Sequence, residues 1–244
     1  MNYLNNNANP DILARGGALD ISVVLRQVYL WMTLGLLATA GTAALVSQTS
    51  LPLMLASNPI LWLVALFAEL GLVIFITARI SRLDPVTAAM LFLTYAVLNG
   101  VTLSFIFLVY NLGTITYAAI AAGAMFAATS LVAYATKIDL SRLGGLLLMA
   151  LIGLVVASIV NMFFHSSGLD QLISYIGVLL FVALTAYDTQ RIKRLALSIS
   201  ANSMGDEATL IGRMSILGAL TLYLDLINLF LFLLRIMGGR GGRR

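Results

Sequence analysis

The chain has 244 residues, of which 61% are hydrophobic and only 10% are charged, and its formal net charge is +4. Soluble domains carry about 25% charged residues, so this composition excludes an ordinary water-soluble protein. The absence of cysteine excludes disulfides and thiolate metal sites, and the single histidine excludes a multi-histidine metal site. The basic residues lie in short connections between apolar segments, which is typical of orientation signals at a lipid bilayer. We therefore expect the bilayer, and no nucleic acid, as a partner.

Seven apolar segments follow one another, each near the ~20 residues that a membrane-spanning helix needs. They cover residues 28–48, 60–79, 85–109, 114–135, 143–165, 170–190 and 214–236. Because backbone groups in hydrocarbon must be hydrogen bonded internally, these segments are predicted to be helices. The fold class predicted is an all-α integral membrane protein with a bundle of seven transmembrane helices.

The domain organisation predicted is a polar N-terminal segment (1–26), a transmembrane domain (27–237) and a basic C-terminal tail (238–244). The polar lead is long and the first apolar run is long enough to span. This start does not resemble a cleaved secretory signal.

Basic residues alternate between the two sides of the predicted bundle. Ten of the 14 Lys and Arg residues precede the first span or lie at the connections after the second, fourth and sixth spans. This alternation predicts a multi-pass protein with a cytoplasmic N-terminus. Seven spans would place the C-terminus outside, but four basic residues lie at the end of the chain, and basic residues favour the cytoplasmic side. They are Arg235, Arg240, Arg243 and Arg244. A re-entrant sixth segment, whose strongly apolar part covers only 172–186, would bring that tail inside. We favour seven spans.

Three acidic residues, Glu69, Asp188 and Asp225, fall within or at the edge of the spans. A charged side chain at the bilayer centre costs about 2.5–3.5 kcal/mol on insertion scales, and such residues usually mark ion or proton pathways. Simpler roles stay open: an ion pair with a nearby Arg for Glu69, an interfacial charge for Asp188, and a protonated structural acid for Asp225.

Asp225 shares one face of the last helix with Gly218, Thr221 and Asn228, because these residues are spaced by three or four positions. This narrow polar face is expected to point into the protein. Asn228 also fits a purely structural role, in which it forms a hydrogen bond between neighbouring helices.

Looser polar or small faces occur in other spans. The sixth span has Ser174, Gly177, Thr185 and Asp188, interrupted by Phe181; the third has Tyr95, Asn99 and Thr102; the fifth has Gly153, Ala157 and Asn161. Together these faces predict a hydrated or hydrogen-bonded centre.

Two stretches in the last two spans carry a resemblance to a known family. "AYDTQRIK" (186–193) and "SILGALTLYLDLINLFLFLLRIMG" (215–238) closely resemble signatures of the transmembrane Bax inhibitor motif family, the Bax inhibitor-1-like membrane proteins. "QVYLWMTLGLLATA" (27–40) and "NGVTLSFIFLVY" (99–110) look like early spans of its bacterial branch. The resemblance implies a seven-helix bundle in the cell inner membrane, with the last helix surrounded by the others.

Members of this family are described as pH-sensitive calcium leak channels controlled by two Asp residues on the sixth and seventh helices. The resemblance implies that Asp188 and Asp225 are the pH-sensing, gating pair and transient ligands of calcium, which is the permeant ion and no cofactor. A second-span acid and an Arg assist in the family. Glu69 fits that acid, and Arg79, or alternatively Arg82, fits that Arg. Thr221 and Asn228 are expected to support Asp225.

We hypothesise that the two acids form an electrostatic gate. Two carboxyl groups in a poorly hydrated site retain one proton between them, which joins the two helices in a closed state. Loss of that proton leaves two anions that repel one another and attract a hard divalent cation. Helix rise places Asp188 about 14 Å from the middle of a span centred near Leu179, so the sequence does not establish contact with Asp225.

Two other functions remain open at this point. A proton-coupled cation transporter would also use buried acids. A non-conducting membrane protein could instead interact with, or modulate, a membrane-bound protease. No motif of an enzyme is present, including the "GxGD" type of intramembrane aspartyl proteases, so we expect no catalytic activity. The sequence does not predict the oligomeric state.

Overall fold

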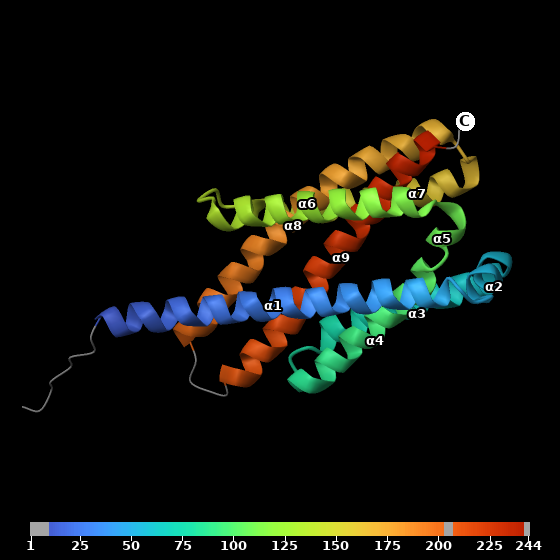
Figure 1. The fold of residues 1–244 in the computed structure, drawn as a ribbon. Coiled ribbons are helices and arrows are strands. Elements are labelled where there is room, and N and C mark those ends of the chain that lie inside the picture. The colour runs from blue at the N-terminus through green and yellow to red at the C-terminus, as the bar shows by residue number, and fades with distance from the viewer. Residues whose placement is uncertain (1–9, 203–206, 242–244) are drawn as a thin grey trace, which may run out of the picture.

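The computed structural model describes residues 10–202 and 207–241, with side chains described for 22–197 and 208–239. The described elements are α1 (Pro10–Val46), α2 (Leu51–Ser57), α3 (Pro59–Arg79), α4 (Pro85–Leu103), α5 (Ile106–Val109), α6 (Leu112–Ala135), the 3-10 turn η1 (Ser141–Leu143), α7 (Gly144–Phe164), α8 (Ser167–Asn202) and α9 (Glu207–Gly241). Figure 1 shows these helices and their order.

Seven helices in the described part of the chain are long and apolar enough to cross a membrane. They correspond one for one to the seven predicted segments, so the predicted fold class is confirmed. The sixth is one continuous helical span of 31 residues, Ser167–Leu197. Its length favours a full crossing over the re-entrant alternative. α1 begins at Pro10, so the described part of the polar 1–26 segment is helical.

Polar side chains fix where three of the spans begin. Asn58 accepts hydrogen bonds from the backbone N–H groups of Ile60 and Leu61 at the start of α3. Asp84 accepts from Thr87 N at 2.9 Å before α4, and Asn111 accepts from Thr114 N at 2.8 Å before α6. Pro59 and Pro85 occupy the first turns of α3 and α4, where a missing N–H carries no penalty. These caps satisfy donors that the helices cannot satisfy themselves.

α9 has the largest buried share of the seven spans, and it packs against α1, α4, α6 and α8. In Figure 1 it crosses the molecule diagonally. By contrast, α3 packs mainly against α4 and presents most of its surface outward. That the last helix is surrounded by all the others stays a prediction.

The two ends of the bundle differ in charge. The connections after α3 and α6, with the C-terminal part of α8, lie at one end, which we call the basic end (Figure 1). It carries Arg79, Arg82, Lys193 and Arg194. The opposite end is formed by α2, α5, the α7–α8 connection and the C-terminal part of α9.

Candidate functional site

The two acids predicted to form a gate lie on adjacent helices. Asp188 on α8 is 7% exposed and Asp225 on α9 is 4% exposed. Their carboxyl groups are close enough to interact electrostatically. The described span of α8 continues to Leu197, so Asp188 lies only about six residues, or about 9 Å, beyond its middle. The longer helix therefore reduces the depth offset of Asp188 from about 14 Å to about 9 Å.

The Asp225 carboxyl is not satisfied by its surroundings. Its Oδ2 is buried and has no hydrogen-bond partner within the described residues. The Asp188 Oδ1 lies 3.8 Å from Nη1 of Arg191, whose side chain is exposed. Buried polar atoms almost always have a partner, so an unpaired carboxyl oxygen beside a second carboxyl group needs an explanation. A proton shared by the pair, or a cation bound to it, would supply the missing interaction.

A small cavity leads to Asp188 from the basic end. It has a volume of about 70 Å³, room for about two water molecules. Asp188, Arg191, Gly218 and Thr221 lie in its wall, together with Thr77 of α3. Water can therefore reach one side of the acid pair.

Thr221 and Asn228, the two predicted supporting residues, bond to their own helix. Thr221 Oγ1 donates to the Leu217 carbonyl at 3.0 Å, and Asn228 Nδ2 donates to the Leu224 carbonyl at 2.8 Å. Thr221 also faces the cavity at the basic end, as its predicted helix face requires.

Glu69, the third membrane acid, belongs to a separate hydrogen-bonded cluster, which we call the Glu69 cluster. Its Oε1 accepts from Thr102 Oγ1 at 2.6 Å and its Oε2 accepts from Asn99 Nδ2 at 3.1 Å. Asn99 Oδ1 in turn accepts from the Tyr223 hydroxyl at 3.0 Å, which lies 2.7 Å from Thr39 Oγ1. The cluster ties α3 to α4, α9 and α1.

Sequence reasoning did not single out Tyr223 and Thr39. The available signal was the Tyr223 hydroxyl in an otherwise apolar run, because a buried Tyr hydroxyl usually finds a hydrogen-bond partner. The Arg79 side chain is exposed at the end of α3. Neither Arg79 nor Arg82 forms an ion pair with a described acidic side chain. In place of the alternative in which Glu69 pairs with a nearby Arg, its carboxyl group accepts hydrogen bonds from α4.

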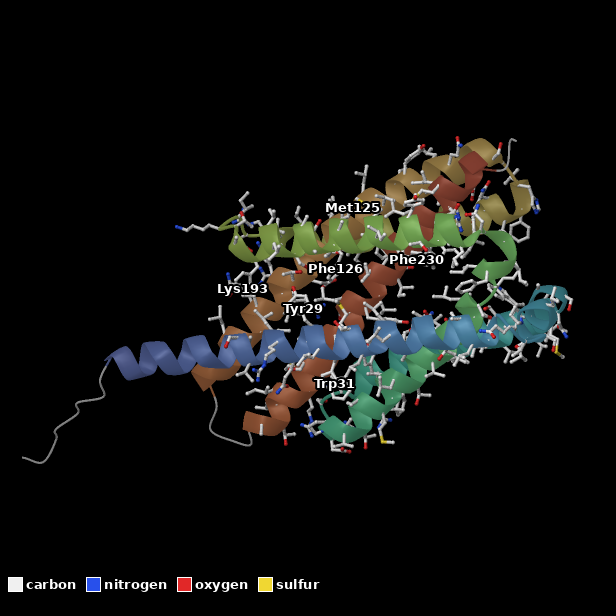
Figure 2. All side chains as sticks on the ribbon, viewed as in Figure 1. Tyr29, Trp31, Met125, Phe126, Lys193 and Phe230 are labelled. Atoms are coloured by element: carbon white, nitrogen blue, oxygen red, sulfur yellow. The ribbon has the colours of Figure 1, made fainter. Side chains whose placement is uncertain are left out.

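The residues that follow Asp188 anchor α8 to the α6–α7 connection. Gln190 Oε1 accepts from Leu140 N at 3.1 Å, and its Nε2 donates to the Ile138 carbonyl at 2.8 Å. Lys193 lies beside the end of α6, as Figure 2 shows, and its Nζ donates to the Tyr134 carbonyl at 2.9 Å. The "YDTQRIK" stretch thus places one acid in the interior and fixes its helix with the polar residues beyond it.

The described residues contain no group of three or more His, Cys, Asp or Glu side chains that could hold a metal ion. Calcium takes six to eight oxygen ligands in proteins, and the two carboxyl groups supply at most four oxygens. The two carboxyl groups alone therefore do not complete a resident calcium site.

Comparisons with known proteins match most of the chain. The family described as inhibitor of apoptosis-promoting Bax1 matches residues 21–242. The inner membrane protein YbhL of Escherichia coli K12 is 44% identical over 221 residues, covering 90% of this chain and 93% of YbhL. An uncharacterized protein of Deinococcus radiodurans is 43% identical over 223 residues, covering 91% of this chain and 92% of the relative. An uncharacterized protein of Borreliella burgdorferi is 39% identical over 217 residues, covering 88% and 91%.

Proposed function

Since the chain belongs to the Bax inhibitor-1 family of membrane proteins, we propose that it is a pH-sensitive calcium leak channel gated by Asp188 and Asp225. The name of its Escherichia coli relative supports a location in the inner membrane. The alternation of basic residues supports a cytoplasmic N-terminus, which puts the basic end in the cytoplasm.

One observation carries this proposal: the buried Asp225 Oδ2 has no partner within the described residues, and Asp225 lies on α9, which packs against the helix that carries the buried Asp188. A purely structural acid would be expected to have its oxygens satisfied, as those of Glu69 are. An unpaired carboxyl oxygen beside a second acid is poised to exchange a proton or a cation.

The gate works by electrostatics. At acid pH one proton shared by the two carboxyl groups cancels half of their charge and joins α8 to α9. When that proton leaves, two anions face each other in a poorly hydrated site, and their repulsion favours separation of the helices. The same two anions attract calcium, whose preferred ligands are carboxylate and carbonyl oxygens. Protons thus close the path, and calcium replaces them when it opens.

Calcium flux into liposomes, measured as a function of pH, tests the proposal. We expect the purified protein to pass calcium faster as the pH rises, and Asp225→Asn to remove this pH dependence, because an amide cannot share or release the proton. Asp84→Asn is the matched control, since Asp84 is exposed before α4 and an asparagine can still cap that helix. It should leave the pH dependence unchanged.

Two results would contradict the proposal. An unchanged pH response in Asp225→Asn would eliminate the acid pair as the gate. A saturable flux coupled to proton movement would identify a transporter instead of a leak. If no ion passes at any pH, co-purification with a membrane-bound protease becomes the measurement that distinguishes the non-conducting alternative.

A further inference from the structure

The contact between α8 and α9, which we call the seam, repeats every two helical turns. Phe181 lies seven residues before Asp188 on α8, and Phe232 lies seven residues after Asp225 on α9. Seven residues make about two turns and about 10 Å of rise, so each Phe shares the face of its acid. The two helices are antiparallel, and the pair of acids and the pair of rings lie at successive levels of one seam.

A second cavity enters the seam from the opposite end. It has a volume of about 170 Å³, and its wall includes Ser174, Gly239 and the ion pair between Asp170 and Arg235. The ion pair has an N–O distance of 3.3 Å, and Ser174 is buried at 1% exposure. Polar side chains therefore line the seam from this end as far as Ser174, just as Asp188 and Thr221 line it from the basic end.

Between the two cavities the seam is closed by aromatic rings. Phe181 and Phe232 stack with ring centroids 5.8 Å apart and planes at 29°. Gly177 makes this possible, because a Cβ at that position would lie 2.7 Å from atoms of the Phe232 ring. The guanidinium of Arg235 lies 5.8 Å from the centre of the same ring and covers it from the opposite end. Gly177 of α8 thus lets the two rings approach closely, and the Arg235 guanidinium covers the Phe232 ring on the side of the opposite end.

We propose that the Phe181–Phe232 stack is a hydrophobic gate in series with the acid pair, which closes the seam between the two cavities. An apolar constriction stops ions by excluding the water that hydrates them. The polar residues on both sides of the stack are those that a hydrated path requires and that contact with lipid would not favour. The inference rests on the proposed function, because it names a second barrier on the same path. Release of the proton at Asp188 and Asp225 is then necessary for conduction, and the rings must also part.

Thiol labelling tests this gate without using calcium. The chain has no cysteine, so a single introduced cysteine is the only thiol. Ser174→Cys, in the cavity at the opposite end, shows which side of the membrane that cavity faces when a membrane-impermeant thiol reagent is added. Thr185→Cys is the reporter: Thr185 is fully buried, and it lies four residues beyond Phe181 and three before Asp188.

With both rings present, Thr185→Cys should react slowly from the side on which Ser174→Cys reacts. Phe181→Ala combined with Phe232→Ala should raise that rate about tenfold or more, because water then fills the constriction. Phe164→Ala is the matched control, since Phe164 is 76% exposed on α7, and it should leave the rate unchanged. If the double variant does not fold, Phe232→Leu retains an apolar side chain without the ring and should raise the rate by a smaller factor.

An unchanged labelling rate in the folded double variant, or in folded Phe232→Leu, would overturn the gate. Calcium flux measured on the same proteins separates the two proposals. Faster labelling without calcium flux at any pH keeps the gate and rejects the calcium leak. Calcium flux in the protein with both rings, with labelling unaffected by their removal, keeps the leak and rejects the gate.

Discussion

The seam and the contact between α3 and α4 both place a carboxyl group inside the membrane, but the two carboxyl groups differ in their hydrogen bonding. At the α3–α4 contact both oxygens of Glu69 accept a hydrogen bond, from Asn99 and from Thr102. In the seam the Asp225 Oδ2 has no partner within the described residues and faces another acid instead. The first arrangement ties the helices of the bundle together, whereas the second leaves an oxygen that the proposed proton or cation would satisfy. Hydrogen-bond satisfaction, more than depth in the membrane, distinguishes Glu69 from the acid that we propose as part of a gate.

The largest effect on stability is expected from breaking the Glu69 cluster. Asn99→Leu removes a donor to Glu69 and the acceptor of the Tyr223 hydroxyl, so we expect the free energy of unfolding to fall by about 2–4 kcal/mol. Asp225→Asn loses no hydrogen bond at Oδ2 and should change it by about 1 kcal/mol or less. Circular dichroism during unfolding in detergent measures both changes.

Asn228→Leu is the control for Asn99→Leu, because the Asn228 side chain donates only to its own helix. Its cost should be about 1 kcal/mol. If Asp225→Asn proves as destabilising as Asn99→Leu, Asp225 is a structural acid after all, and the contrast between the two regions fails.

A smaller effect should follow from crowding the seam. Gly177→Ala pushes a Cβ against the Phe232 ring, and we expect a loss of about 1–3 kcal/mol in the free energy of unfolding. Gly153→Ala on α7 is the matched change, since nothing lies within 4 Å of its added Cβ. It should be neutral, or stabilising by up to about 1 kcal/mol through helix propensity. Equal unfolding midpoints for the two variants would show that the seam is loosely packed.

The smallest effect concerns a carboxylate outside the spans. Hydrogen bonds from the backbone N–H of Ser141, and then from its hydroxyl, lower the pKa of Asp139 below its ordinary 3.8, with a smaller contribution from Arg194. Because the folded pKa is the lower one, this stabilisation is present above pH 3.8 and is lost as the pH falls through the folded value. The difference in melting temperature between the protein and Asp139→Asn should therefore shrink on acidification between about pH 5 and 2. A difference that grows on acidification would show the opposite sign of shift.

Hydropathy predicted the seven spans because lipid leaves a helix as the only way to satisfy the backbone. It also identified Asp225 and the polar face formed by Asn99 and Thr102. It could not match that face to Glu69, because the lateral order of helices is not encoded in the periodicity of any one of them. Arg79 followed from the resemblance alone, and it forms no ion pair with an acidic side chain that the structure describes.

The seam shows a second limit of the sequence. Phe181 interrupts the polar stripe on the sixth span, so the sequence pattern indicates it. Its partner Phe232 lies in a run of Leu, Phe and Ile, where no pattern distinguishes it. The end of that span was also placed too early, because Arg191, Lys193 and Arg194 looked like the start of a loop. The helix continues through them to Asn202, so Asp188 lies within the helix and not at its end.

The same extension of α8 has a consequence for the rate at which cations could enter. Asp188 lies 14 residues before the end of α8, about 21 Å along the helix, and Arg191, Lys193 and Arg194 follow it toward that end. A cation that approaches from the basic end passes these three positive charges and one exposed negative charge, that of Asp139 paired with Arg194. The excess of positive charge lowers the local cation concentration at the entrance. A protein that conducts cations through such an approach is suited to a trickle that drains a store over time, and not to the rapid currents of excitable membranes.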